Sequence, residues 1–181
     1  MNKIIKEWLP YLIIIIVVVL IRTYIVTPVI VRGDSMYNTL EDGEVLFLSK
    51  ISYKLSDIKR FDIIVINDLE DGLIIKRVIG LPGDKVEVKD GILYINDKAI
   101  KEEYISNQHI DYIMDDFDTN FICKINDLEC NNKIPEEMYL VLGDNRQISA
   151  DSRIKGLIKK DQILGKAIFR IWPLNRISIT K

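Results

Sequence analysis

Histidine is nearly absent from the chain, which contains a single one, His109, among its 181 residues. A serine nucleophile activated by histidine needs the imidazole within hydrogen-bond reach. His109 stands in "SNQHIDY", within an acidic stretch that has no clear hydrophobic period. A Ser-His-Asp arrangement is therefore poorly supported, and a serine nucleophile in this chain would need a different base.

The sequence also lacks an excess of positive charge. Its 25 Lys and Arg residues face 27 Asp and Glu residues, which gives a formal net charge of -2. Nucleic acid binding depends on a basic stripe whose side chains contact phosphates. We therefore expect no nucleic acid partner.

Cysteine is scarce, with only Cys123 and Cys130. No histidine adjoins them in "FICKINDLECNN", which argues against a catalytic cysteine. A disulfide and two free thiols both remain open, the disulfide being permitted outside the cell. The neighbouring "DFDTNF" has Phe121 where a calcium loop needs glycine, and the sequence predicts no metal site.

One long apolar run is present, "WLPYLIIIIVVVLIRTYIVTPVIV" at residues 8–31, with Arg22 as its only charge. Its length suits a membrane-spanning helix, and we predict an anchor over residues 8–30. Lys3 and Lys6 precede it, so the positive-inside bias predicts a cytoplasmic segment 1–7. No small-residue cleavage site follows, which disfavours a removed signal sequence. A buried core helix is the alternative.

The remaining residues, 31–181, are predicted to form one extracytoplasmic domain. Short apolar runs such as "FDIIVIND" and "ILYINDKAI" alternate with turn signals, a pattern typical of a mostly β domain. Asp90-Gly91 between two such runs is a strong hairpin signal. Residues 101–135 are acidic and have no clear period, so we expect an irregular loop or a small insertion there.

Lys76 is unusual because it lies within the apolar run "LIIKRVIGL". Such a lysine either extends its charge to water or loses its proton through desolvation, which would make it a general base. Ser35, in the glycine-led turn "VRGDSMYNTL", is either a turn residue or the nucleophile of a Ser-Lys pair. A third polar cluster is "GDNRQISADSRIKG" at residues 143–156.

These segments resemble the bacterial type I signal peptidases, in the short form typical of Gram-positive cells. The resemblance covers nearly the whole chain: the apolar anchor, Ser35-Met36, "FDIIVI", "KRVIGLPGD", "GDNR" followed by "SADSR", and "GKAIFRIWPLNRI" near the end. It implies a single membrane-spanning helix followed by a β-rich catalytic domain of the signal-peptidase type. The implied activity is a membrane-anchored Ser-Lys endopeptidase that removes signal peptides from exported preproteins.

The resemblance also implies roles for individual residues. Ser35 would be the nucleophile, Lys76 its general base, and Ser149 would hydrogen-bond to the lysine amine and orient it. Met36 would help shape the floor of the substrate cleft. The residues that would support the site by ionic and hydrogen-bonded contacts are Asp144, Arg146, Asp151 and Arg153.

Two positions depart from the family pattern. Asn38 stands where proline is usual, so the turn loses a fixed φ angle, although asparagine also suits turns. Gly33 stands where some members place a serine that donates to the oxyanion hole. Stabilisation of the tetrahedral intermediate would then depend on the backbone N–H of Ser35.

The expected substrate is the extended end of a signal peptide, bound by strand addition and cut after an A-x-A-like site. The expected localisation is the cell membrane, with a single pass and a cytoplasmic amino terminus. We expect a monomer that contacts the lipid bilayer and needs no cofactor. The alternatives are a Ser-Lys autoprotease and an anchored β domain that only binds partners.

Overall fold

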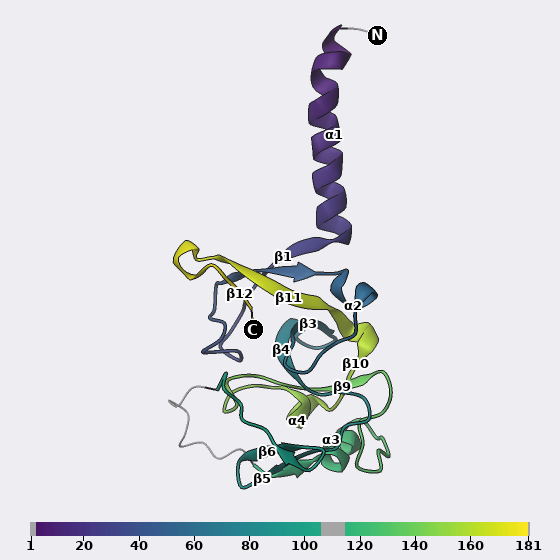
Figure 1. Ribbon diagram of the computed structural model, residues 1–181, viewed down its shortest axis with the longest axis vertical. Helices are drawn as coiled ribbons and strands as arrows, with labels where there is room; N and C mark the ends of the chain where they lie inside the picture. Colours follow the sequence, from purple (N-terminus) through teal and green to yellow (C-terminus); the bar gives the residue numbers. More distant parts are fainter. Residues whose placement is uncertain (1–2, 106–114, 181) are drawn as a thin grey trace.

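The computed structural model describes residues 3–105 and 115–180. Its first element is helix α1 (Lys3–Tyr24), which projects away from the rest of the chain (Figure 1). Residues 7–24 of this helix have a mean hydropathy of 1.8, and none is buried by the remainder of the protein. Helix α1 is therefore long and apolar enough to cross a membrane.

Helix α1 ends before the anchor predicted over residues 8–30 does. It ends at Tyr24, and strand β1 (Val26–Ile30) follows and pairs antiparallel with β2 (Val45–Ser49). The β-branched residues of β1 favour an extended backbone. Pro28 lacks the N–H that a helix interior needs, whereas the edge strand β1 accommodates it. The prediction was therefore wrong for residues 25–30.

The larger of two antiparallel sheets carries the catalytic lysine predicted from the sequence. Its strand order is β1-β2-β11-β3-β4-β9-β10, and β12 pairs with β11 (Figure 1). Lys76 lies on β4, next to β3 and opposite Ile64. The strands not yet bounded are β3 (Ile63–Asp68), β4 (Gly72–Gly80), β9 (Met138–Leu142), β10 (Ile158–Lys159), β11 (Ile163–Trp172) and β12 (Ser178–Ile179).

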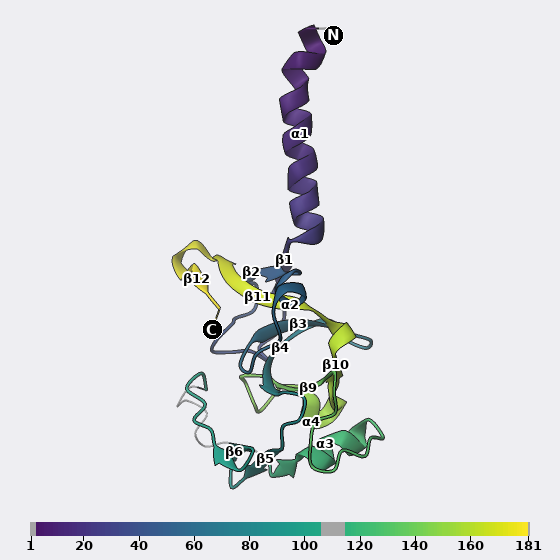
Figure 2. The same cartoon turned by 45° about the vertical axis from the view of Figure 1, so that its right-hand side comes forward.

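A smaller sheet, with the order β7-β6-β5-β8, lies at the end of the domain that is farther from α1 (Figure 2). The predicted hairpin is confirmed: Asp90 and Gly91 join β5 to β6, both with positive φ angles. The strands are β5 (Val86–Lys89), β6 (Ile92–Ile95), β7 (Lys98–Ala99) and β8 (Phe117–Asp118).

Residues 115–135, part of the segment expected to be an irregular loop or a small insertion, contain regular elements. They contribute β8 and helix α3 (Thr119–Ile125), and Asp118 caps the helix by accepting a hydrogen bond from the Phe121 N–H. Cys123 and Cys130 form a disulfide, which the sequence had left open. These elements pack into the apolar core beneath the smaller sheet. His109 lies outside the described residues.

Two short α-helices and two 3-10 turns lie between the strands of the described residues. Helix α4 (Ser152–Lys155) follows the polar cluster at residues 143–151 and contacts both β9 and α3. Helix α2 (Ser52–Leu55) and the 3-10 turns η2 (Lys160–Gln162) and η3 (Leu174–Arg176) connect strands of the larger sheet. Helix α4 therefore connects the polar cluster to α3.

Candidate active site

Ser35 and Lys76 meet at one face of the larger sheet. The Lys76 amine donates a hydrogen bond to the Ser35 hydroxyl, with Nζ and Oγ 2.8 Å apart. Ser35 is half-buried in the loop between β1 and β2, whereas Lys76 is only 3% exposed on β4. Within residues 3–105 and 115–180, Ser35 is the one hydrogen-bond partner of this amine.

Burial lowers the pKa of Lys76 below the ordinary lysine value of 10.5, because desolvation disfavours the charged ammonium. The carboxylates of Asp151, Asp71 and Asp144 act in the opposite direction, and the charge of Lys155 adds to the lowering. The desolvation of the amine exceeds the attraction of these carboxylates. The site thus provides a lysine that releases its proton more readily than a lysine in water.

Arg77, the next residue on β4, pairs with Asp144. The guanidinium donates from Nε to Oδ1 at 2.8 Å and from Nη2 to Oδ2 at 2.7 Å, and both side chains are 1% exposed. Thr39 donates from Oγ1 to Asp144 Oδ2 at 2.5 Å, and the Phe61 carbonyl accepts from Arg77 Nη1 at 3.0 Å. This bidentate pair connects the loop after Ser35, strand β4 and the 143–151 cluster.

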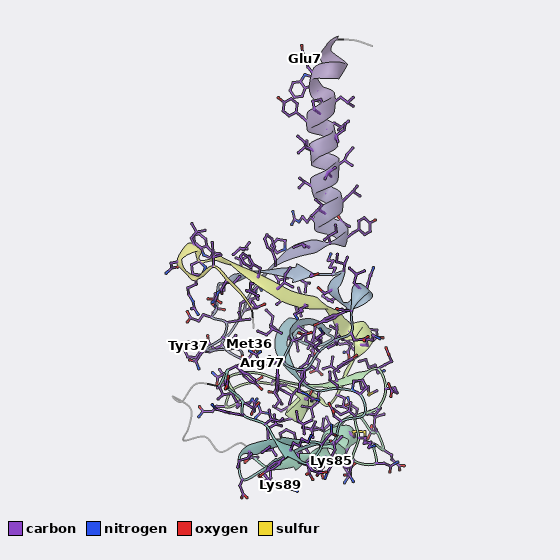
Figure 3. All side chains as sticks on the ribbon, viewed as in Figure 1. Glu7, Met36, Tyr37, Arg77, Lys85 and Lys89 are labelled. Carbon is purple, nitrogen blue, oxygen red and sulfur yellow. A yellow bond between two sulfur atoms is a disulfide. The ribbon has the colours of Figure 1, made fainter. Side chains whose placement is uncertain are left out.

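Arg77 was missed by the sequence reasoning, although a signal for it was present. Neighbouring strand residues point to opposite faces, so Lys76 and Arg77 cannot share one environment. A guanidinium inside an apolar strand stays charged and therefore needs a carboxylate. In the view of Figure 3 the labels of Arg77, Met36 and Tyr37 fall in the middle of the β domain. Met36 and Tyr37 follow Ser35 in the chain, and Arg77 contacts the same loop at Thr39.

Arg146 is tied to a residue from the segment that was predicted to be irregular. Its Nε donates to the Gly143 carbonyl at 3.0 Å, and its Nη1 donates to Glu102 at 3.1 Å, with a second contact from Nη2. Tyr104 donates its hydroxyl proton to Glu102 at 2.5 Å and covers Arg77 with its ring, 4.1 Å from the guanidinium carbon to the ring centroid. Glu102 and Tyr104 were also missed by the sequence reasoning.

Asp151 and Arg153 form the pair that shapes the end of the polar cluster. Asp151 accepts from Arg153 Nε and Nη2, both at 2.8 Å, and caps α4 through the Arg153 N–H. Its other contact is the Gly143 N–H, which donates to Oδ2 at 3.0 Å. Arg153 also donates to the Arg146 carbonyl at 2.8 Å. These contacts hold the polar cluster together around Gly143.

Ser149 does not make the hydrogen bond expected of it. Its hydroxyl is buried and has no hydrogen-bond partner among the described residues, so the predicted bond to the lysine amine is absent from the structure. Ser149 packs against Gly143 instead: a Cβ added to Gly143 would lie 2.2 Å from Ser149 Oγ and 2.5 Å from the Ser35 carbonyl oxygen. That carbonyl accepts from the Asn145 N–H at 3.0 Å, a contact the sequence reasoning also missed.

Met36 and Gly33 define the surroundings of the Ser35 backbone. Met36 is 1% exposed and packs into the apolar core with Leu40, Leu46 and their neighbours. Gly33 has a φ of 75°, a region that favours glycine, and its N–H donates to Asp42 at 2.7 Å. Whether Met36 shapes a substrate cleft stays a prediction.

The described part of the chain contains no group of three His, Cys, Asp or Glu side chains placed to hold a metal ion. The polar groups nearest the reacting atoms are the Ser35 hydroxyl, the Lys76 amine and backbone N–H groups. Such a set suits proton transfer and stabilisation of a negative oxygen.

Residues 5–172 match the family described as signal peptidase, peptidase S26. Signal peptidase IB of Staphylococcus aureus (strain COL) is 39% identical over 180 residues, which cover 97% of this chain and 93% of that protein. Signal peptidase I of Bacillus caldolyticus is 36% identical over 173 residues, which cover 96% and 93%.

The crystal structure of a signal peptidase I from Enterococcus faecalis superposes with a TM-score of 0.52 at 36% identity, covering 61% of this chain and 97% of that one. The expected β-rich domain of the signal-peptidase type is therefore confirmed. Together with the match over residues 5–172, these likenesses show that the chain belongs to the signal peptidase family, peptidase S26.

Proposed function

We propose that Ser35 is the nucleophile and Lys76 the general base with which the chain, a serine endopeptidase of this family, cleaves signal peptides from preproteins. The observation that carries the assignment is the 2.8 Å contact between Ser35 Oγ and a buried amine. Burial also lowers the pKa of Lys76. A serine hydroxyl needs an adjacent base to become a nucleophile, and a neutral lysine amine can be that base.

The reaction begins when the Lys76 amine, in its neutral form, accepts the proton of the Ser35 hydroxyl. Ser35 Oγ then attacks the scissile carbonyl, and the protonated lysine delivers the proton to the leaving amine. The result is an acyl-enzyme and a free mature amino terminus. Water gives a proton to the same lysine and attacks the acyl-enzyme carbonyl. The lysine then returns the proton to Ser35 Oγ as the ester bond breaks and the signal peptide is released with a free carboxylate.

The oxyanion of each tetrahedral intermediate is assigned to the backbone N–H of Ser35. Gly33 offers no hydroxyl at the position that some family members use, and its own N–H is engaged by Asp42. Backbone donors held in a fixed loop stabilise a developing negative oxygen without reorganisation. The Asn145 N–H fixes this loop by donating to the Ser35 carbonyl.

The remaining predicted site residues are assigned to support. Asp144 fixes the cluster to β4 through Arg77, while Asp151 and Arg153 hold Gly143 from the other side. Arg146 joins the same glycine to Glu102. In this arrangement the loop that contacts Ser35 is restrained from several directions, which keeps the nucleophile and its base in hydrogen-bond geometry.

Helix α1 is assigned as the membrane anchor, with residues 1–7 cytoplasmic and the β domain on the outer side. The support for this orientation is the pair Lys3 and Lys6 before the apolar helix. Strand β1 begins two residues after α1 ends, so the site is held close to the bilayer. An extended preprotein segment can reach the site there and bind by strand addition. We assign the enzyme as a monomer.

The test is cleavage of a preprotein in detergent micelles by the full chain, by Ser35→Ala and by Lys76→Met, with product masses as the readout. We expect loss of cleavage in both variants and cutting after an A-x-A-like site by the unaltered chain. Matched controls are Ser56→Ala and Lys160→Met, which alter exposed residues and should keep activity. Full activity in either site variant would refute the dyad.

A further inference from the structure

Lys155, the last residue of α4, contacts three carboxylates of one turn. Its Nζ lies 2.9 Å from Asp71, 3.1 Å from Asp68 and 3.5 Å from Glu70. Asp68 is the last residue of β3, and Glu70 and Asp71 lie in the turn that leads to β4. The Lys155 side chain is 12% exposed. A lysine with this burial and this number of partners differs from an isolated surface ion pair, which contributes little.

The turn that Lys155 holds is itself organised by Asp68. Asp68 Oδ1 accepts hydrogen bonds from the N–H groups of Glu70, at 3.0 Å, and Asp71, at 2.9 Å. Contact with Asp68 therefore restrains the turn as a unit. The turn leads directly into β4, the strand that carries Lys76. Lys155 is thus connected to the position of the proposed base.

The other side of Lys155 is fixed as well. Asn126, which caps the end of α3, donates to the Lys155 carbonyl at 3.4 Å and accepts from the Leu157 N–H at 2.5 Å. At its first residue, α4 is capped by Asp151, which also binds the Gly143 N–H. Figures 1 and 2 both show α4 between β9 and α3. Lys155 therefore connects helix α4 to the turn between β3 and β4.

Lys76 is surrounded by charges of both signs from these same elements. The carboxylates of Asp151, Asp71 and Asp144 favour its ammonium form, whereas Lys155 disfavours it. Arg77, the adjacent cation, is paired with Asp144. Asp71 is the only one of these carboxylates that contacts Lys155 among the described residues. The Asp71 side chain is 55% exposed, so water screens part of its effect on the buried amine.

We propose that Lys155 is a positioning residue for Lys76: it docks the β3–β4 turn on α4 and compensates the charge of Asp71, so that the base keeps its place and its charge balance. The proposal rests on the dyad assigned above. It predicts that Lys155 and Asp71 affect the proton affinity of Lys76 in opposite directions, although they are partners in one ion pair.

The experiment is the pH dependence of kcat/KM for preprotein cleavage by the full chain in detergent micelles. Because the base must be neutral, activity rises with pH through the pKa of Lys76. We call the pH range of this rise the acid limb. Lys155→Met removes a cation and should move the acid limb to higher pH by about half a unit. Asp71→Asn removes an anion and should move it down by a similar amount, about half a unit.

Three further variants isolate the effect. Lys155→Arg keeps the positive charge, so its acid limb should lie close to that of the unaltered chain. The double variant Lys155→Met/Asp71→Asn should show partial cancellation of the two shifts. The matched control is Lys160→Met, which removes a lysine paired with the exposed Glu137 and should leave the limb unmoved.

Shifts of opposite sign support the proposal. Limbs that stay in place, or that move in the same direction with activity reduced at every pH, would overturn it in favour of a purely structural role. If Lys155→Met does not fold, Asp71→Asn decides by itself: a lower limb supports the proposal and an unmoved limb contradicts it. Activity retained in Lys76→Met would instead refute the dyad, which separates the two failures.

Discussion

Lys76 and Arg77 are neighbours on β4, and both are almost fully buried, yet they reach opposite outcomes. Lys76 has a lowered pKa, and among the described residues its amine has one hydrogen bond, to a serine hydroxyl. Arg77 binds both oxygens of Asp144 and lies under the Tyr104 ring. Burial by itself therefore does not decide what a cation does. The surroundings on each face decide how strongly the charged form is stabilised.

The largest effect is expected from Lys76→Arg, which would make the two neighbours chemically alike. An arginine keeps its proton at every accessible pH and cannot act as a base. We expect preprotein cleavage to fall by a factor of about 10³ or more, because a general base supplies up to about 10⁴. The measurement is single-turnover cleavage, with thermal unfolding to verify the fold. Activity within tenfold of the original would contradict the assignment of Lys76.

The second prediction removes the partner of the other cation. Asp144→Ala leaves the Arg77 guanidinium buried without its bidentate carboxylate, which should lower the free energy of unfolding by about 3–5 kcal/mol. Thermal unfolding of the full chain in detergent measures the loss. The double variant Asp144→Ala/Arg77→Met should recover part of the stability, since no unpaired charge remains. A loss below about 1 kcal/mol, the size expected of a surface ion pair, would show that the buried Arg77 guanidinium does not depend on Asp144.

The third and smallest effect concerns stability and pH. Because the pKa of Lys76 is below its ordinary value of 10.5 in the folded chain, the unfolded chain binds more protons between the two pKa values. Stability due to this group is present above pH 10.5 and is lost as the pH falls through the folded pKa. Lys76→Met should therefore be more stable than the original chain at pH 7, with a smaller gain at pH 10.

The measurement is the free energy of unfolding of the unaltered chain and of Lys76→Met at pH 7 and at pH 10. Lys160→Met is the control for loss of an exposed lysine. An equal change at both pH values would mean that the amine is not penalised by burial. A gain in stability together with a loss of activity is the usual relation between a strained functional group and its fold.

The contrast also shows why the site was only partly predictable. Ser35 and Lys76 were named from short segments, and the structure brings them within 2.8 Å of each other. The sequence reasoning gave the supporting residues no partners, because Asp144 binds Arg77, 67 positions away, and Arg146 binds Glu102, 44 positions away. Ser149 was expected at the lysine amine, but its hydroxyl has no hydrogen-bond partner within the described ranges.

By itself the sequence determined what depends on local pattern. The apolar run specifies a helix long enough for a membrane, the alternation of apolar runs and turns specifies a β domain, and Asp90-Gly91 specifies a hairpin. Only the tertiary structure decided where α1 ends, since β1 gains its hydrogen bonds by pairing with β2. It also decided which carboxylate neutralises which cation, because such pairs depend on distances between segments far apart in the chain.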